Sequence, residues 1–344
     1  MKNQAEAIKE FILSNVEAHP KDITNQTMNK FKVTRPTVHR HLTYLIKNNQ
    51  IEKSGTTNTS QYFLKSSFNK RINYEIKPEL SESQIWQEEF NSQAAKLKEN
   101  VREICYYGFT EMVNNAKDHS EGNVVAVSSK IEGDLLVFTI SDDGVGIFKK
   151  IRDAFNLSDE RESILQLSKG KLTTAKEYHS GEGIFFTSRA FDCFSILANG
   201  LFYMRDNSVQ DWFVEERENT DEASTVVKFK ININSERVLR DVFKKFENPE
   251  TSAFDRTHVL VKLSLSNEDY FVSRSQAKRI LAGIEKFNHV TLDFKDIKSV
   301  GQAFVDEVFR VFKNRFPNIK IDTINSNADI DFMIRRGIET AKTL

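Results

Sequence analysis

A helix that carries a carboxylate and an amide four residues apart is the feature that most constrains what this chain can fold into. The segment 109–121 reads FTEMVNNAKDHSE, and Glu111 and Asn115 fall on one face of the helix that it predicts. Phe109 and Met112 can turn toward a core from the neighbouring face. The pattern therefore predicts a polar partner or ligand opposite Glu111 and Asn115.

Two glycine pairs follow this helix along the chain. Gly144 and Gly146 come after Asp142 at the end of a predicted strand, and Gly181 and Gly183 precede a helix expected to start near residue 184. Glycine lets the backbone turn tightly beside a ligand, and the unpaired N–H groups at the start of a helix attract anionic oxygens. The two pairs therefore predict turns that approach a bound group closely.

In this order, and with Thr225 opening a closing strand, the motifs resemble the N box, G1 box, G2 box and final strand of the GHKL nucleotide-binding fold. That fold is shared by gyrase, heat-shock chaperone, mismatch-repair and histidine-kinase ATP domains. The resemblance covers residues 83–233 and implies a central α/β sandwich that binds ATP and Mg²⁺. The ending NNAKDHS is similar to that of bacterial anti-sigma serine kinases. No phosphoacceptor histidine helix precedes this domain, which disfavours a two-component sensor kinase.

The resemblance implies a role for each motif residue. Asn115 would give magnesium an oxygen ligand, since this ion prefers hard oxygens and keeps several waters. Glu111 would be the catalytic base, orienting or deprotonating a nucleophile in line with the γ-phosphate. Asp142 would accept the adenine amino hydrogen. The other cofactor-binding candidates are Gly144, Gly146, Gly181, Gly183, Thr225, Lys169 and Lys171.

Some of these candidates have an alternative interpretation. Lys169 and Lys171 fall in the region expected to form a lid, where they could add positive charge near the phosphates or simply be solvated surface lysines. His119 is expected to be a cation favoured by the helix C-terminus rather than a catalytic group.

Residues 1–65 predict three helices and a hairpin. AEAIKEFILSNVEAH repeats apolar residues at helical spacing, TRPTVHRHLTYLIKNNQ begins a later helix with Pro36 in its first turn, and IEKSGTTNTSQYFL gives two β-like runs around a polar tip. The order resembles the winged helix-turn-helix family over the whole segment. It implies an N-terminal α+β winged helix that binds DNA.

The charge of this segment favours the same function. Residues 1–65 contain ten Lys and Arg against five Asp and Glu. The candidate DNA-binding residues lie at the start of the third helix and in the hairpin, where side chains can meet base edges and phosphates: Thr34, Arg35, Thr37, His39, Arg40 and Lys53. The alternative is a protein-interaction or dimerisation module with a solvated basic face.

Residues 66–82 are expected to form a linker, because periodicity is lost there and Pro78 interrupts it. Residues 255–344 alternate predicted strands and helices, which calls for an α/β layer with its own core. Within them, VTLDFKDIKSVGQAFVDEVFRVF resembles the middle of a STAS-type domain, the anti-sigma-antagonist fold. The turn that would carry a phosphorylated serine reads VGQAF, and Ser299 lies before it. We therefore expect this STAS-like domain to bind a protein partner, its own nucleotide domain or a second copy through an unphosphorylated surface.

Composition limits the other possibilities. The 344 residues suffice for two or three domains, and Lys plus Arg equals Asp plus Glu at 49 each, so a nucleic-acid or membrane partner would have to meet a local patch. Cys105 and Cys193 have no CxxC spacing, which disfavours a disulfide framework and a structural zinc site. The chain has no apolar run of about eighteen residues. We expect a soluble, cytoplasmic protein that does not enter a membrane.

Together, these patterns predict an ATP-binding and ATP-hydrolysing regulatory protein that binds DNA through the winged helix and signals through the STAS-like domain. One alternative is a serine/threonine kinase of the anti-sigma type that acts on a separate partner. Another is a nucleotide-gated scaffold in a defence or stress system, which would bind ATP in order to form a homodimer.

Overall fold

The fold is that of a computed structural model, which describes residues 4–16, 18–48, 50–56, 60–64, 68, 70–172, 181–217, 224–264 and 270–343. The chain divides into two compact units. One unit consists of Met1–Lys70 with Ser129–Ile131, and the other of Arg71–Ser128 with Glu132–Leu344. In the described part of the chain, no helix is both long enough and apolar enough to cross a bilayer.

The smaller unit consists of short helices followed by a hairpin. Its elements are α1 (Gln4–Asn15), α2 (Ile23–Phe31), α3 (Arg35–Lys47), β1 (Ile51–Ser54) and β2 (Gln61–Leu64). Strands β1 and β2 pair antiparallel, and Pro36 lies in the first turn of α3, where a missing N–H costs nothing. Ile12, Leu42 and Tyr62 bring the helices and the hairpin into one apolar core. The order of elements is the one that the sequence predicted.

The larger unit is built on a mainly antiparallel sheet. Among the described residues this sheet has seven strands in the order β3-β4-β5-β9-β6-β7-β8. The strands are β3 (Lys70–Glu75), β4 (Val124–Glu132), β5 (Leu135–Asp142), β6 (Cys193–Ala198), β7 (Leu201–Asp206), β8 (Asp211–Glu216) and β9 (Thr225–Asn232). The helices associated with it are α4 (Glu82–Glu89), α5 (Asn91–Ala94), α6 (Glu99–His119), α7 (Ile147–Phe155), α8 (Glu160–Lys169), α9 (Gly183–Ala190) and α10 (Leu239–Lys244).

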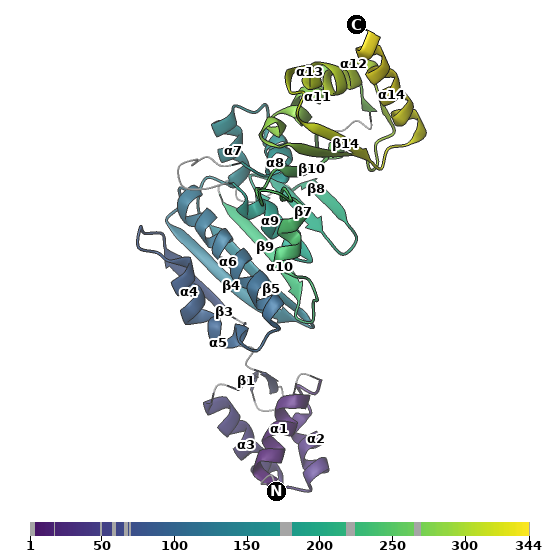
Figure 1. The fold of residues 1–344 in the computed structure, drawn as a ribbon. Helices are drawn as coiled ribbons and strands as arrows, with labels where there is room; N and C mark the ends of the chain where they lie inside the picture. Colours follow the sequence, from purple (N-terminus) through teal and green to yellow (C-terminus); the bar gives the residue numbers. More distant parts are fainter. Residues whose placement is uncertain are drawn as a thin grey trace. The chain divides into compact units, whose positions relative to one another are not determined.

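Helices lie on one face of this sheet (Figure 1), and aromatic side chains pack them onto it. Trp86 of α4 and Phe109 of α6 lie 5.3 Å apart between ring centroids, and Phe138 of β5 stacks on Phe229 of β9 at 5.5 Å. Residues of β9 alternate between buried and half-buried along the strand, as expected for a sheet covered on one face. The plentiful phenylalanines therefore form the layer between the helices and the sheet.

The predicted linker over residues 66–82 is wrong in part. Strand β3 lies within it and takes a place at the edge of the sheet beside β4. Residues of β3 alternate between half-buried and exposed, so the strand contributes little apolar surface. An edge strand with so few buried residues leaves a weak sequence pattern.

The C-terminal part of the larger unit is an α/β layer. Its parallel sheet has the order β10-β12-β14 in the described residues, and β11 pairs with β13 beside it. The strands are β10 (Arg256–Leu260), β11 (Tyr270–Phe271), β12 (His289–Asp293), β13 (Ser299–Val300) and β14 (Lys320–Ile324). The helices are α11 (Arg274–Leu281), α12 (Gln302–Asp306), a π-helical turn (Glu307–Phe312), α13 (Lys313–Arg315) and α14 (Ala328–Thr343). The predicted alternation of strands and helices over 255–344 is confirmed.

One apolar core joins this layer to helices of the central sheet. Leu165 of α8 and both Phe185 and Phe186 of α9 are at most 1% exposed, and they belong to the same buried cluster as Val259 of β10 and Ile280 of α11. The sequence predicted that the C-terminal layer has a core of its own. This prediction is wrong, because residues between 160 and 190 complete that core.

Candidate functional site

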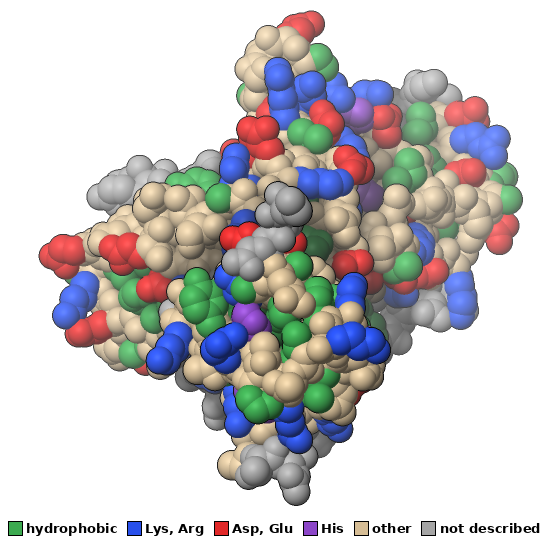
Figure 2. All heavy atoms as spheres, turned by 90° about the horizontal axis from the view of Figure 1, so that it is seen from below, with side chains coloured by type: hydrophobic (Ala, Val, Ile, Leu, Met, Phe, Trp, Pro, Cys, Tyr) green, Lys and Arg blue, Asp and Glu red, His purple; other side chains and the backbone are tan. Residues whose placement is uncertain are grey.

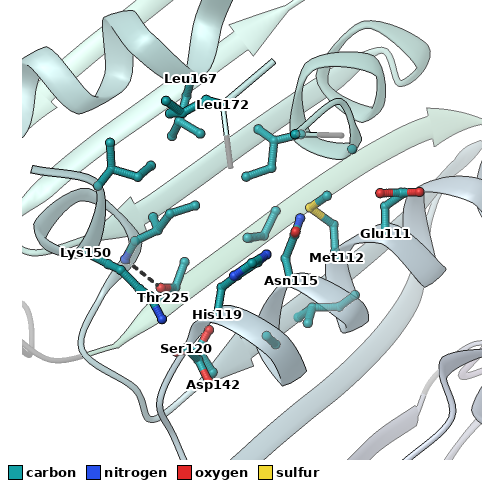
Figure 3. A pocket seen from close by; sticks show the side chains of 18 of the residues that line it. Glu111, Met112, Asn115, His119, Ser120, Asp142, Lys150, Leu167, Leu172 and Thr225 are labelled. Carbon is teal, nitrogen blue, oxygen red and sulfur yellow. Dashed lines mark hydrogen bonds between the residues drawn. The ribbon is translucent and has the colours of Figure 1, made fainter. Parts of the chain in front are cut away.

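A cavity of about 320 Å³ lies between α6, the ends of β5 and β9, and helices α7, α8 and α9 (Figure 3). Its walls combine polar and apolar side chains, and most of the side chains from α8 and α9 are apolar. The polar and glycine positions that line it are Glu111, Asn115, His119, Ser120, Asp142, Lys150, Gly181, Glu182, Gly183 and Thr225. The apolar positions include Met112, Ile140, Ile147, Leu167, Leu172, Phe185 and Val227.

The structure brings most of the predicted site residues to this cavity. The α6 pair, Asp142, the second glycine pair and Thr225 all line it, although they come from segments up to 114 residues apart, between Glu111 and Thr225. Gly144 and Gly146 do not line the cavity and form the turn that joins β5 to α7. Residues 173–180, which belong to the expected lid, lie outside the described residues.

The helix α6 presents its polar pair to the cavity as the sequence predicted. Met112 and Val113 between the two residues are buried, so the helix is fixed by its apolar face. The Nδ2 atom of Asn115 is buried and has no hydrogen-bond partner among the described residues. A buried amide atom without a partner is uncommon in folded proteins, so Asn115 leaves one hydrogen-bond donor unsatisfied here.

The second glycine pair approaches α6 closely. A Cβ atom added to Gly183 would lie 2.1 Å from Oε2 of Glu111, and Gly181 has a φ of +72°, in the left-handed region. Gly183 is the first residue of α9, so the start of this helix faces the carboxylate end of the α6 pair. A side chain at this position would displace the carboxylate of Glu111.

Asp142 is held at the end of β5. Its Oδ1 accepts a hydrogen bond of 3.0 Å from the backbone N–H of Gly144, and the residue pairs with Thr225 across β5 and β9. Burial raises the pKa of Asp142 to about 6, although hydrogen bonds from the backbone of Gly144 and Thr225 lower it and Lys150 adds a smaller lowering effect. Near neutral pH the carboxylate is thus ionised in a largely apolar surrounding.

The turn after β5 is fitted to the end of α6. A Cβ atom on Gly144 would lie 2.0 Å from the backbone oxygen of Ser120, and that oxygen accepts a 3.0 Å hydrogen bond from the backbone N–H of Val145. Gly146 has a φ of +84°. The hydroxyl of Thr225 accepts a hydrogen bond of 3.1 Å from the N–H of Ile147 and so links β9 to the start of α7. These contacts fix Asp142 relative to α6.

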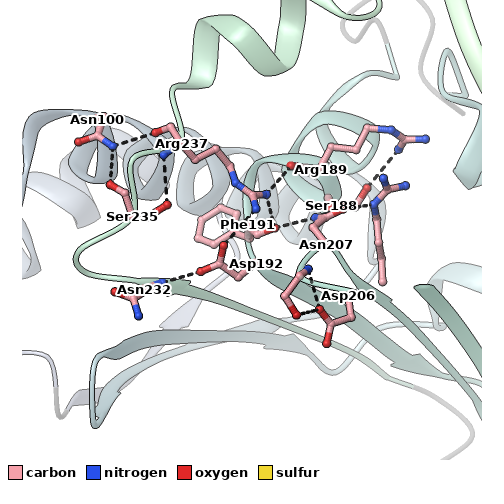
Figure 4. A network of polar contacts seen from close by, with 12 residues as sticks. Asn100, Ser188, Arg189, Phe191, Asp192, Asp206, Asn207, Asn232, Ser235 and Arg237 are labelled. Atoms are coloured by element: carbon pink, nitrogen blue, oxygen red, sulfur yellow. Dashed lines mark hydrogen bonds and ion pairs between the residues drawn. The ribbon is translucent and has the colours of Figure 1, made fainter. Parts of the chain in front are cut away.

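The far end of α9 is fixed by a polar network (Figure 4). Its last carbonyl groups accept hydrogen bonds from two side chains: Arg237 donates to the oxygens of Arg189 and Phe191 at 3.0 and 2.9 Å, and Asn207 donates to the oxygen of Phe191 at 2.7 Å. Asp192 pairs with Arg237 at 3.1 Å. These bonds satisfy a helix terminus that would otherwise leave buried acceptors unpaired.

Sequence reasoning missed Lys150. This lysine lies on the cavity wall, and its Nζ forms an ion pair of 2.9 Å with Glu121 at the end of α6. Its side chain is 19% exposed, which is low for a lysine. The available signal was its place four residues after Gly146, on the first turn of the helix that follows the glycine turn.

Lys169 and Lys171 do not line the cavity. Lys169 ends α8 and is 1% exposed, and its Nζ donates to backbone oxygens of Arg279 and Ala282 in the C-terminal layer. The Nζ of Lys171 donates to the oxygen of Lys286 at 2.9 Å. Neither the predicted phosphate contact nor the alternative of a solvated surface lysine fits Lys169, because its amine is buried against another part of the chain.

The candidate DNA-binding residues lie at the start of α3 and, in the case of Lys53, in β1 of the smaller unit. Thr34, Arg35, Arg40 and Lys53 are exposed, whereas Thr37 and His39 are partly buried. None of Arg35, Arg40 and Lys53 makes an ion pair with a described carboxylate. On the face that Figure 2 shows, Lys and Arg side chains are dispersed among uncharged and acidic ones. A phosphate backbone would therefore meet separate exposed cations, such as Arg35, Arg40 and Lys53, rather than one dense basic patch.

Within the described part of the chain, a bound metal ion would find no cluster of strong ligands. The residues that the structure describes contain no group of three or more His, Cys, Asp or Glu that could hold one. At the cavity, the possible ligands among the described residues are the amide of Asn115, the imidazole of His119 and single carboxylates such as that of Glu111.

Comparison with known families concerns the C-terminal part of the chain. A family model described as a STAS-like domain of unknown function (DUF4325) matches residues 276–331, from α11 into α14. A search of curated proteins gave no match. Together with the parallel sheet β10-β12-β14 and its helices, the family match identifies the C-terminal part of this chain as a STAS-like domain.

Proposed function

We propose that this chain is a regulatory protein that binds ATP with Mg²⁺ in the central cavity, hydrolyses it, and binds DNA through the smaller unit. The observation that carries the proposal is the meeting of the α6 pair, Asp142 and the second glycine pair in one cavity, in the arrangement implied by the resemblance to GHKL domains. A cavity of about 320 Å³ lies within the range of about 300–1,000 Å³ typical of small-molecule sites.

The residues present fit a magnesium nucleotide. Asn115 is the first support, because it lines the cavity and its amide oxygen is a hard ligand of the kind that magnesium prefers. Magnesium keeps several waters and takes further oxygens from phosphates, so one protein ligand suffices. The second support is Gly183, which lines the cavity as the first residue of α9, where the unpaired N–H groups of a helix can meet anionic oxygens.

Each residue would have a separate task. Asp142, ionised near neutral pH, would accept the adenine amino hydrogen and so select adenine over bases that lack this donor. Bound ATP would supply the phosphoryl group that is released. Glu111 would orient or deprotonate the attacking water, and Lys150 would add positive charge at the cavity wall.

The regulatory part of the proposal rests on the two other parts of the chain. Arg35, Arg40 and Lys53 are exposed cations on a helix and a hairpin, which suits contact with DNA phosphates. A STAS-like domain suits contact with another protein. Binding of ATP can change either contact only if ATP favours one conformation over another.

Calorimetric titration with ATP and Mg²⁺ tests the central claim. We expect saturable heat from the wild-type protein and none from D142A, while GTP should bind more weakly. Phosphate release should accompany binding and should be lost in E111A. No heat with any adenine nucleotide would overturn the proposal, and transfer of γ-labelled phosphate to a protein in place of release would favour the kinase alternative.

A gel shift at fixed salt tests the DNA part separately. We expect the wild type to retard DNA, R35A and R40A to weaken the shift, and Mg-ATP to change the affinity. Retardation that is the same with and without Mg-ATP would overturn the coupling. An unchanged shift in both arginine variants would overturn the assignment of α3.

A further inference from the structure

Helix α8 separates the cavity from the STAS-like domain. Leu167 on one side of α8 lines the cavity, and Leu165 on another side is buried in the core shared with β10 and α11. Leu172, which follows α8, also lines the cavity. A shift of α8 would therefore move the cavity wall and the domain contact together.

The end of α8 is attached to α11 by a buried amine. The Nζ of Lys169 donates to the oxygen of Ala282 at 2.8 Å, to the oxygen of Arg279 at 3.0 Å and to Oε1 of Gln166 at 3.3 Å. These three acceptors match the three hydrogens of an ammonium group. Two of them are carbonyl groups at the C-terminal end of α11, where a positive charge is favoured and where carbonyls lack partners within the helix.

Other bonds surround this amine. The hydroxyl of Thr257 in β10 donates to the backbone oxygen of Lys169 at 2.7 Å. Arg279 forms an ion pair of 2.6 Å with Glu162 in the first turn of α8. Lys171 and Lys286 each donate to the backbone oxygen of the other, at 2.9 and 3.1 Å. We call these bonds, together with those of Lys169, the α8–α11 contact.

We propose that Lys169 is a positioning residue: by holding α8 on the C-terminal end of α11, it makes the shape of the cavity, and hence the affinity for nucleotide, depend on docking of the STAS-like domain. The nucleotide part of this inference rests on the proposed function. Coupling between two sites is reciprocal, so nucleotide in the cavity must in turn stabilise the α8–α11 contact.

Burial explains why this lysine is a sensitive point. Burial lowers the pKa of Lys169 to about 7, while the charges of Glu285 and Glu162 raise it and that of Lys286 lowers it. The hydrogen bonds to α11 offset this cost of burial. If the amine is removed, the carbonyls of Arg279 and Ala282 lose a donor at a part-buried contact, so α8 and α11 are expected to separate locally.

The test compares K169M with K278M in the full chain. A methionine side chain in place of Lys169 would keep the apolar stem and remove the donors, whereas Lys278 is an exposed lysine on α11 and makes a matched control for the same substitution. We expect K169M to raise the ATP dissociation constant by about tenfold or more and K278M by less than about twofold. Without nucleotide, K169M should also speed hydrogen exchange in peptides covering 160–169 and 183–190.

R279Q is a milder second variant, since it removes the ion pair to Glu162 and leaves Lys169 in place. R279Q should raise the ATP dissociation constant and speed hydrogen exchange at 160–169 and 183–190, each by a smaller factor than K169M. This variant keeps the test valid if K169M does not fold. A residue that only stabilises the fold would lower the melting temperature and leave the dissociation constant of the folded protein unchanged, and that result would overturn the proposal.

The exchange measurement separates this proposal from the proposed function. If the wild type binds no nucleotide, the proposed function fails, but faster exchange at 183–190 in K169M would still support a role of Lys169 in shaping the cavity. If the wild type binds ATP and neither variant changes the exchange at 183–190 or the affinity, the positioning role fails and the proposed function stands.

Discussion

Asp142 combines two properties that oppose one another in a folded protein. Its carboxylate is buried at the end of β5, and only backbone N–H groups and the more distant Lys150 favour its charge. An ionised group in such a place lowers stability in return for a strong hydrogen-bond acceptor in the cavity. This balance leads to one prediction for binding and one for stability.

For binding, we expect the affinity for ATP to decrease as the pH falls below about 6. The pKa of Asp142 is raised to about 6, so acid converts the acceptor into a neutral carboxyl group. The decrease should approach about tenfold per pH unit between pH 6 and 5 and should be absent from D142N. Calorimetry at pH 5, 6 and 7 measures it; equal slopes in both proteins would contradict the assignment of Asp142.

For stability, the pH dependence runs in the opposite direction: the ionised Asp142 lowers the free energy of unfolding. Because the pKa in the folded state is raised from an ordinary value of about 3.8 to about 6, the folded protein binds the extra proton in this window, and the stability that the proton provides is lost as the pH rises through 6. D142N should therefore increase the free energy of unfolding at pH 7 by up to about 3 kcal/mol and have little effect below pH 4. Urea unfolding at the two pH values measures both effects.

Gly183 allows a test of the acid on α6 without removing it. A methyl group at Gly183 meets Oε2 of Glu111, which is the mobile end of a long side chain and can move aside. G183A should thus change the free energy of unfolding by less than about 1 kcal/mol and reduce phosphate release by about tenfold or more. Normal phosphate release in a well-folded G183A protein would argue against Glu111 as the base.

At the level of single residues, the sequence predicted the positions that depend on neighbouring residues in the chain. Glu111 and Asn115 could be paired because the helical repeat places them on one face, and Asp142 because a glycine turn follows its strand. The buried contacts of Lys169 could not be predicted, because its acceptors lie 110 and 113 residues further along the chain. No local pattern carries that information.

Among the elements, the turn between β5 and α7 has the least freedom. Gly144 lies against the backbone of Ser120 at the end of α6, and neither chain segment can yield without breaking the hydrogen bond from Val145 to Ser120. The end of one helix and the end of one strand are therefore joined by backbone contact, and this contact sets the distance between Asn115 and Asp142.

We expect G144A to be much more destabilising than G183A. Its Cβ would lie 2.0 Å from a backbone oxygen rather than from the end of a flexible side chain. The cost should be about 2–4 kcal/mol in the free energy of unfolding. Chemical denaturation of the two variants side by side tests this order, and equal stability would show that the turn can relax.

The elements also differ in how well the sequence predicted them. Helix α6 and strands β4 and β5 have long apolar patterns, and the structure has them where the sequence indicated. Strand β3 was missed because KRINYE offers few apolar residues and gains its place from pairing with β4. Strand pairing is a contact between segments, and periodicity within one segment does not report it.

At the scale of the whole molecule, the larger unit has one continuous apolar core. Leu165, Phe185 and Phe186 share a buried cluster with residues of the C-terminal layer, and without that layer these three large side chains would lose part of their cover. At up to about 1.5–3 kcal/mol for each, this loss is a large fraction of the total stability of an ordinary domain.

A fragment of residues 71–254 should accordingly fail to fold as a stable monomer. We expect it to bind a hydrophobic dye and to aggregate, while a fragment of residues 71–344, which keeps the core, should unfold in one cooperative transition. Light scattering and thermal melts of the two fragments measure the difference. A monomeric, cooperative 71–254 fragment would show that the shared core is dispensable.

The shared core also bears on how such a chain can diversify. A STAS-like domain connected by a free tether could be exchanged for a homologue as a cassette. Here a chimera would have to reproduce both the apolar surface that receives Phe185 and the pair of carbonyl groups that receives Lys169. Substitutions on α8, α9 and α11 are thus expected to covary among related proteins. Recombination between residues 190 and 270 should rarely give a folded, functional protein.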